Sequence, residues 1–134
     1  MTDTLPAPGE PDPGLRTTTV TAAGARRRVR ELLAARAPGA VPRAVGDALL
    51  VTSEIVTNAV RHGGGATGFT AEVAGGVLVL AVTDRSPARP VVADPDIRPR
   101  IGGYGWPLVL SLAVSVEIAE TPGGKTVRVR LPLT

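Results

Sequence analysis

The sequence predicts one α+β domain, a two-layer sandwich in which helices cover one face of a mostly antiparallel sheet. Residues 22–62 contain two segments whose apolar residues recur three and four positions apart, the period of amphipathic helices. Two pairs of β-rich segments follow, and each pair is joined by a glycine-containing turn. Because helices and strands come in runs rather than in strict alternation, the order favours an α+β fold.

The composition excludes several kinds of functional site. The chain has 134 residues, which suits one domain with a modest core. It has no cysteine and one histidine, which excludes disulfides, thiol catalysis and multi-histidine metal sites. Its net charge of +3 comes almost entirely from arginine, and only 2% of its residues are aromatic, so single-stranded nucleic acid is not a favoured partner.

The two ends of the chain differ in composition. Residues 1–14 are rich in proline and acids, which predicts a disordered tail before a folded domain of residues 15–134. The tail lacks the apolar block of a secretory signal. The longest apolar stretch, Trp106 to Ala119, is too short and too polar to span a bilayer. We therefore expect a cytoplasmic protein without a membrane span.

The first half of the domain is predicted to contain a strand and two helices. Leu15 to Val20 is rich in threonine and suits a strand, for example one at the edge of the sheet. Thr21 is an N-cap residue for a helix over residues 22–37, which Pro38 and Gly39 end. Pro42 suits the first turn of a second helix that runs to about His62 and ends at a run of three glycines.

The second helix is predicted to have one core face and one polar face. The core face comprises apolar residues and one threonine: Val45, Ala48, Leu49, Thr52, Ile55, Val56 and Ala59. The opposite face comprises Asp47, Val51, Glu54, Asn58 and Arg61.

The second half is predicted to be mostly strand. Strands over residues 67–74 and 77–84 are joined by Gly75-Gly76, a hairpin signal, and the second is apolar enough to be central. Arg85 to Arg100 is a proline-rich loop of a length that is usually functional. A helix over residues 106–113 and a final hairpin, with strands over residues 114–120 and 126–133, complete the chain.

Glu54 and Asn58 lie four residues apart and project from the same face of the second helix. The carboxamide could bind Mg²⁺, and the carboxylate could accept a proton from a hydroxyl that attacks a phosphate. The alternative is an ordinary solvated helix face. If this pair of residues is considered alone, that alternative is favoured.

Three further motifs could bind a nucleotide, and each has a plainer interpretation. Asp84 ends the apolar strand and could accept a hydrogen bond from an exocyclic amine such as adenine N6, or could simply begin a turn. The glycines of residues 102–105 precede a helix and could bind phosphate through backbone N–H groups, or could belong to an ordinary loop. In the last hairpin Lys125 and Thr126 could face the nucleotide, or the segment could be only a turn.

Four arginines of the first helix, Arg26, Arg27, Arg28 and Arg30, lie away from its apolar stripe. A solvated face is the favoured interpretation. A docking surface for an acidic regulatory partner comes next, and a nucleic-acid-binding domain is a third, less favoured reading of the whole chain.

The order of these motifs is more specific than any one of them. A Glu/Asn helix, a strand ending in Asp, a long loop, a glycine turn into a helix and a final GGKT hairpin resemble the GHKL ATPase superfamily. Within it, the phrases SEIVTNAVRHG, GGYG and PGGKTVRVRLPL are similar to the RsbW-like anti-sigma-factor serine/threonine kinase family. The resemblance covers about Leu15 to Leu133.

The resemblance implies a Bergerat-type site for ATP and Mg²⁺. Asn58 would be the metal ligand, Glu54 the general base and Asp84 the residue that binds adenine. Thr126 would lie near the adenine. The phosphates would be wrapped by three glycines, with residues 85–101 as a lid: Gly102, Gly103 and Gly105.

The resemblance also implies a role and partners. The chain would be a cytoplasmic, homodimeric kinase that phosphorylates a serine or threonine of an anti-anti-sigma-type protein and otherwise holds a sigma factor, without direct contact with nucleic acid or membrane. Three features depart from the family pattern: DRSPARP lacks glycines after Asp84, Tyr104 replaces a basic residue, and Trp106-Pro107 replaces a leucine. These departures keep a non-catalytic, ATP-dependent protein-binding regulator as the alternative.

Overall fold

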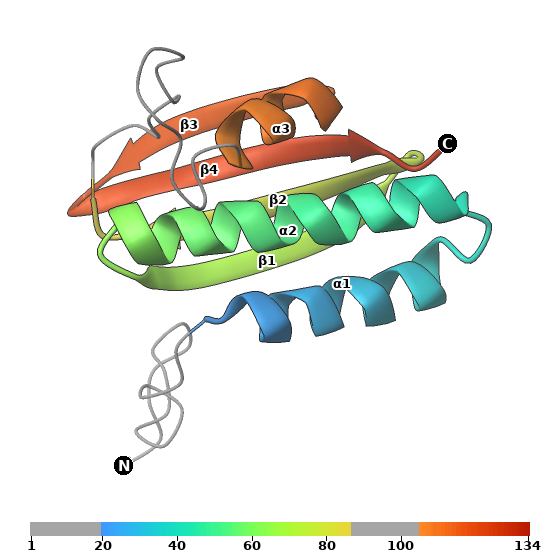
Figure 1. The fold of residues 1–134 in the computed structure, drawn as a ribbon, viewed down its shortest axis with the longest axis horizontal. Coiled ribbons are helices and arrows are strands. Elements are labelled where there is room, and N and C mark those ends of the chain that lie inside the picture. Colours follow the sequence, from blue (N-terminus) through green and yellow to red (C-terminus); the bar gives the residue numbers. More distant parts are fainter. Residues whose placement is uncertain (1–19, 87–104) are drawn as a thin grey trace.

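The computed structural model of the chain describes residues 20–86 and 105–134, and in this part three helices lie on one face of a four-stranded sheet (Figure 1). The predicted α+β sandwich is therefore confirmed. The elements, in chain order, are α1 (Ala22–Arg36), α2 (Pro42–His62), β1 (Ala66–Ala74), β2 (Val77–Asp84), α3 (Gly105–Leu112), β3 (Ser115–Thr121) and β4 (Gly124–Pro132).

The described strands form one sheet in the order β1-β2-β4-β3, and all three pairings are antiparallel. The predicted central place of β2 is confirmed, and β4 lies beside it. The strand expected over Leu15 to Val20 falls outside the described residues except for Val20, which is not part of a strand.

The helix ends follow the local signals in the sequence. The Thr21 hydroxyl accepts a hydrogen bond from the Gly24 N–H at 3.0 Å, so its role as N-cap of α1 is confirmed. Pro42 is the first residue of α2, where its missing N–H costs nothing. At the other end of α2 the Gly63 N–H still bonds to the Ala59 carbonyl, and Gly64 then turns the chain with a φ of 74°.

The two hairpins turn where the sequence predicts. Gly75 and Gly76 have φ values of 59° and 77°, which are typical of the type I′ turn that joins tightly paired strands. Between β3 and β4 the turn is Pro122-Gly123, with a φ of 87° at Gly123. These turns fix the register of the β1–β2 pair and of the β3–β4 pair, because each pair begins directly beside its turn.

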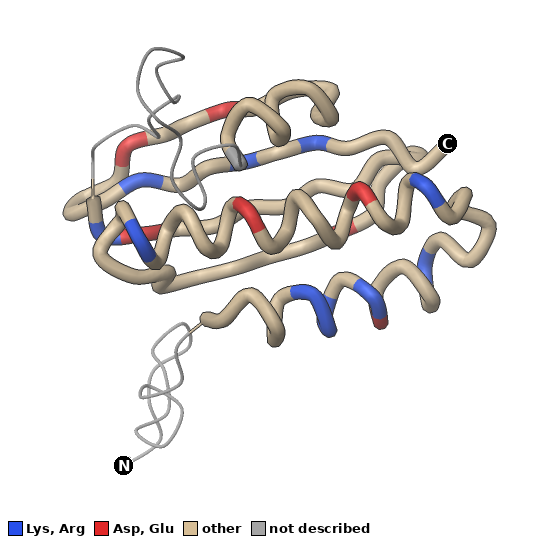
Figure 2. Tube along the Cα trace, viewed as in Figure 1, with Lys and Arg blue, Asp and Glu red and all other residues tan. Residues whose placement is uncertain are grey.

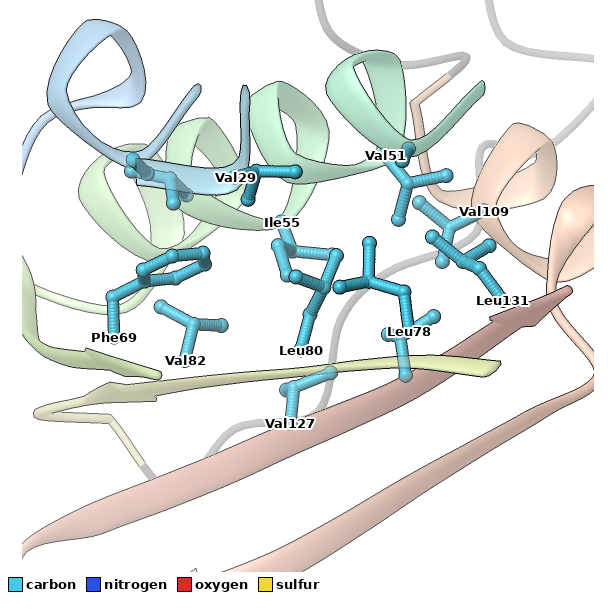
Figure 3. Packing of buried hydrophobic residues seen from close by; sticks show 14 of the residues in the cluster. Val29, Val51, Ile55, Phe69, Leu78, Leu80, Val82, Val109, Val127 and Leu131 are labelled. Carbon is cyan, nitrogen blue, oxygen red and sulfur yellow. The ribbon is translucent and has the colours of Figure 1, made fainter. Parts of the chain in front are cut away.

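The core lies between the sheet and the helices and is almost entirely aliphatic (Figure 3). Ile55 of α2 packs toward Leu80 of β2, and each fully buried side chain of this size contributes about 1.5–3 kcal/mol. Trp106, only 9% exposed, belongs to this cluster, so the single tryptophan packs in the core.

The predicted polar face of α2 was wrong at one position. Val51 is fully buried, because α3 packs along this side of α2 and brings Val109 close to it (Figure 3). A helix that contacts a sheet and a neighbouring helix on each side buries a wider arc than one stripe. Val45 and Leu49, which were predicted to be in the core, are only partly buried.

The predicted solvated arginine face on α1 is confirmed for Arg27, Arg28 and Arg30, which are exposed. Arg26 is partly buried. Arg26 donates a hydrogen bond to the Ser53 hydroxyl of α2 at 2.9 Å. Arg28 donates to the Phe69 carbonyl of β1 at 3.1 Å, and its guanidinium lies 5.3 Å from the centre of the Phe69 ring. These two hydrogen bonds attach α1 to α2 and β1, and Figure 2 shows the basic residues spread along α1.

A search of the helices in residues 20–86 and 105–134 finds none with the length and apolar character needed to cross a bilayer.

Candidate functional site

Asp84, the last residue of β2, is buried at the point where α2 ends. Side chains alternate along a strand, so Asp84 shares the helix-covered face of the sheet with Leu80 and Val82. Only 4% of Asp84 is exposed. A Cβ atom on Gly63, which follows α2, would overlap the Asp84 carboxylate. The glycine therefore lets the helix end lie directly against the acid.

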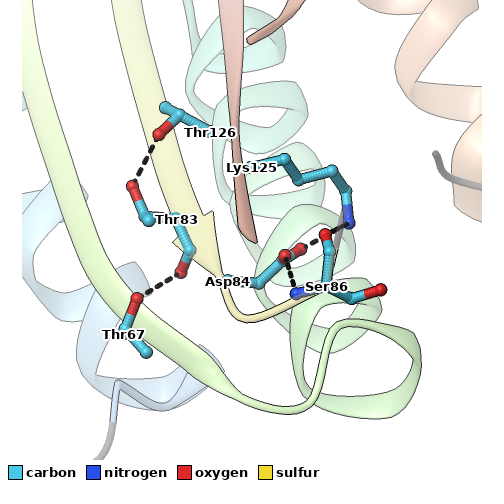
Figure 4. Close-up of polar contacts among 6 residues, drawn as sticks. All are labelled: Thr67, Thr83, Asp84, Ser86, Lys125 and Thr126. Atoms are coloured by element: carbon cyan, nitrogen blue, oxygen red, sulfur yellow. Dashed lines mark hydrogen bonds and ion pairs between the residues drawn. The ribbon is translucent and has the colours of Figure 1, made fainter. Parts of the chain in front are cut away.

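The Asp84 carboxylate is paired with Lys125 (Figure 4). Lys125 Nζ lies 2.7 Å from Oδ2 of Asp84, and only 4% and 3% of the two side chains are exposed. The Ser86 N–H donates to Oδ1 at 2.9 Å, and Lys125 Nζ also donates to the Ser86 carbonyl at 3.1 Å. Each carboxylate oxygen thus accepts a hydrogen bond, and the buried charge is neutralised.

Three backbone segments meet around this ion pair. The Arg85 N–H donates to the Gly63 carbonyl at 2.8 Å, which joins the end of β2 to the end of α2. On β4, a Cβ atom on Gly124 would overlap the Asp84 carbonyl. Glycine at these two positions is required by close packing rather than by a turn.

Thr126 lies on the opposite face of the sheet from Asp84. It pairs with Thr83, and the two hydroxyl oxygens are 2.9 Å apart (Figure 4). Thr126 and Asp84 therefore do not share a face of the sheet, and a place for Thr126 near the adenine stays a prediction. One step along β4 reverses the face, so the residue beside Asp84 is Lys125, which is directly opposite it in the register.

Glu54 and Asn58 lie on the side of α2 that faces α3, and both are partly buried. They continue a stripe that contains Val51, which packs toward Val109, and Asp47, which shares a groove with Leu112. At 1.5 Å per residue, Asn58 lies roughly 8 Å and Glu54 roughly 14 Å along the helix axis from Gly63. The structure thus places a buried acid at the end of α2 and the Glu/Asn pair further along the same helix.

A family model described as histidine kinase-like ATPase domain matches residues 15–131. This chain belongs to that family. The match includes α2, Asp84 and Lys125, so the residues around the buried ion pair are part of the family domain.

One solved structure agrees with this assignment. The domain is 27% identical to the crystal structure of the RsbU and RsbW domains of Rv1364c from Mycobacterium tuberculosis, with a TM-score of 0.59, over 84% of this chain and 29% of that chain. The Erythrobacter litoralis EL346 blue-light activated histidine kinase is 22% identical, with a TM-score of 0.49, over 84% of this chain and 41% of the other. The part of either structure that matches this chain is thus less than half of that structure's own length. No curated protein matches it.

The side chains of this domain suit a metal ion that is coordinated mainly by waters and by the phosphates of a bound molecule rather than by protein groups. Among residues 20–86 and 105–134, no three His, Asp or Glu side chains are grouped so as to hold a metal ion. Mg²⁺ prefers oxygen ligands and usually keeps waters and substrate phosphates in its shell. The carboxamide of Asn58, with the Glu54 carboxylate one turn away, fits such an ion better than an all-protein metal site.

The predicted phosphate-binding turn is only partly visible. Gly102, Gly103 and Tyr104, and residues 87–101 of the predicted lid, lie outside the described residues. Gly105 is the first residue of α3. His62 is exposed in the last turn of α2, where a basic side chain faces the negative end of the helix dipole.

A groove of about 280 Å³ lies at the opposite end of α2, roughly 24 Å along the helix from Gly63 at 1.5 Å per residue. Residues from α2, α3 and the end of β4 line it: Val41, Arg43, Ala44, Asp47, Leu112, Leu131, Pro132 and Thr134. It contains none of the residues predicted to bind a nucleotide.

Proposed function

We propose that this chain is an ATP-binding anti-sigma regulator that transfers the γ-phosphate of Mg·ATP to a serine or threonine of an anti-anti-sigma-type protein. The observation that carries the proposal is the buried Asp84 carboxylate against the end of α2, with Asn58 and Glu54 further along the same helix. Membership of the histidine kinase-like ATPase family implies ATP as the ligand. The similarity to a structure containing an RsbW domain supports the anti-sigma role.

Each residue has a distinct role in this proposal. Asp84 would accept a hydrogen bond from the purine amine, and the Asn58 carboxamide oxygen would hold the metal. When bound, Mg²⁺ neutralises charge on the phosphate oxygens. Glu54 would take the proton from the acceptor hydroxyl as its oxygen bonds to the γ-phosphorus and the bond from that phosphorus to the β-phosphate oxygen breaks, so that ADP leaves.

The test separates binding from transfer. We expect Glu54→Gln to bind Mg·ATP within about twofold of the unchanged protein in isothermal titration, since it keeps the shape of the side chain. Phosphate transfer from labelled ATP to a purified anti-anti-sigma-type protein should fall at least about 100-fold, the effect of removing a positioned base. Asp47→Asn removes an acid from the same helix and should change neither quantity. Transfer that survives Glu54→Gln would reject Glu54 as the base.

A non-catalytic, ATP-dependent regulator is the second candidate, and the Asp84–Lys125 ion pair favours it because the carboxylate already has a partner. In that case Glu54→Gln would leave control of the partner protein intact, whereas Asp84→Asn would abolish it. If the unchanged protein binds ATP but transfers no phosphate to any candidate antagonist, this second function stands.

The same proposal makes the protein a cytoplasmic homodimer that holds a sigma factor. Direct nucleic-acid binding is not part of it, since Arg26 and Arg28 already bond to Ser53 and to the Phe69 backbone. Light scattering of the purified protein tests the dimer: a mass near 13.7 kDa would contradict it.

A further inference from the structure

Lys125 lies on the carboxylate that the proposed function assigns to the purine. We propose that Lys125 is a built-in competitor at this position, so that the Lys125–Asp84 ion pair and a bound purine amine exclude one another. The inference rests on the proposed nucleotide site and adds the residue that sets its affinity.

The hydrogen bonds of Asp84 show why the two donors compete. Lys125 Nζ is 2.7 Å from Oδ2, and the Ser86 N–H is 2.9 Å from Oδ1. A purine amine is also a donor and needs one of the same two oxygens. The lysine bond is charge-assisted and short, so it is a stronger bond than a neutral amine can make.

Packing around the carboxylate prevents the amine from simply adding a third bond. Gly63 leaves no space for even a Cβ atom between the end of α2 and the acid, and Gly124 packs in the same way against the Asp84 carbonyl. Asp84 and Lys125 are 4% and 3% exposed. A purine amine therefore has to take the place of the lysine ammonium.

The sheet offers the displaced lysine a second acid. Glu120 of β3 is directly opposite Lys125 in the register, and paired residues of antiparallel strands project from the same face. Glu120 is exposed, whereas Asp84 on the other neighbouring strand is buried. Lys125 thus stands between two carboxylates and can move from Asp84 to Glu120 through rotation of its flexible side chain.

Titration of Mg·ATP into Lys125→Met tests the competition. Methionine keeps the apolar stem and removes the ammonium, and we expect about tenfold tighter binding than in the unchanged protein. Arg128→Met is the matched control, because Arg128 lies on the opposite face of β4 and is exposed. It removes the same charge and should leave the affinity within about twofold. Glu120→Gln should weaken ATP binding by about threefold, since the displaced lysine loses its acceptor.

A second measurement uses the unchanged protein and does not depend on how a variant folds. Lys125 is the only lysine of the chain. Acetylation by an amine-directed reagent, located by mass spectrometry, therefore reports on this side chain. We expect saturating Mg·ATP to speed acetylation of Lys125 at least about fivefold, because the ammonium leaves its buried partner for an exposed one.

The outcomes are distinct. Tighter binding by Lys125→Met together with faster acetylation in ATP supports the competition, as does binding that only this variant shows. Equal or weaker binding by Lys125→Met, or acetylation that ATP slows, overturns the inference while leaving the nucleotide site in place. If neither the unchanged protein nor Lys125→Met binds ATP, the proposed function fails and the inference falls with it.

Discussion

Within residues 20–86 and 105–134, two ion pairs link β4 to its neighbouring strands, and they differ in their surroundings. Lys125 and Asp84 are 2.7 Å apart, with side chains 4% and 3% exposed, on the helix-covered face. Arg130 and Glu117 are 3.0 Å apart, with side chains 39% and 59% exposed, on the open face. Figure 2 shows that the neighbouring strands carry opposite charges, with acids on β3 and bases on β4.

The two ion pairs differ in hydration, because water reaches the exposed Arg130–Glu117 pair but not the buried Lys125–Asp84 pair. An exposed pair gains little because water screens it, usually up to about 1 kcal/mol. A buried pair loses the hydration of both charges, so apolar residues of similar volume are often at least as stabilising. We infer that the buried pair is present for what Asp84 binds rather than for stability.

The largest effect is expected from Asp84→Asn. The Lys125 ammonium then either stays buried without a carboxylate or moves out to the exposed Glu120 and leaves its buried position empty. In both cases we expect the free energy of unfolding in urea to fall, by about 3 kcal/mol where the charge stays buried. Adding Lys125→Met to Asp84→Asn should recover most of this loss, because no unpaired charge remains. A loss below about 1 kcal/mol for the single variant would mean that the pair is hydrated in solution.

Two glycines, Gly46 within α2 and Gly63 directly after it, give the next largest contrast. Gly63→Ala places a methyl group against the Asp84 carboxylate and should destabilise the fold by about 1–3 kcal/mol. Gly46→Ala, where a Cβ meets nothing within 4 Å, should instead stabilise it by about 0.5–1 kcal/mol through helix propensity. Thermal unfolding of the two variants measures both signs. Equal effects at the two positions would show that Asp84 does not lie against the end of α2.

Features governed by neighbouring residues could be predicted from the sequence. The Thr21 cap, the start of α2 at Pro42 and the glycine hairpin at residues 75–76 depend on a few adjacent residues, and each was confirmed. The central place of β2 followed from its nearly continuous apolar character, although only the helix-covered face of the strand is fully buried.

Features that depend on distant segments could not be predicted in the same way. Val51 is buried because α3, far along the chain, packs on it. Lys125 rather than Thr126 accompanies Asp84 because of the register between β2 and β4, and a shift of one residue would exchange them. Both residues stand in the GGKT motif, and only the pairing of the strands decides which one lies beside Asp84.

Thr126→Val tests that decision with a smaller effect. It removes the hydroxyl contact with Thr83 on the open face and should destabilise the fold by about 0.5–1 kcal/mol. Because the side chain faces away from Asp84, affinity for Mg·ATP in isothermal titration should stay within about twofold. Thr83→Val is the matched variant, and the double variant should cost no more than about either single one if the two hydroxyls bond to each other. A large loss of ATP affinity would contradict the placement of Thr126.

The smallest effect is expected from Glu117→Gln, which breaks the exposed pair with Arg130 and keeps the size of the side chain. The free energy of unfolding should change by no more than about 0.5 kcal/mol, and the change should shrink as salt is added, because ions screen an exposed pair. Urea unfolding at low and high ionic strength measures both quantities. The same comparison on Asp84→Asn should show little dependence on salt, since that pair is out of reach of ions. A loss for Glu117→Gln as large as that for Asp84→Asn would show that burial does not distinguish the two pairs, and the reason for assigning Asp84 to ligand binding would disappear.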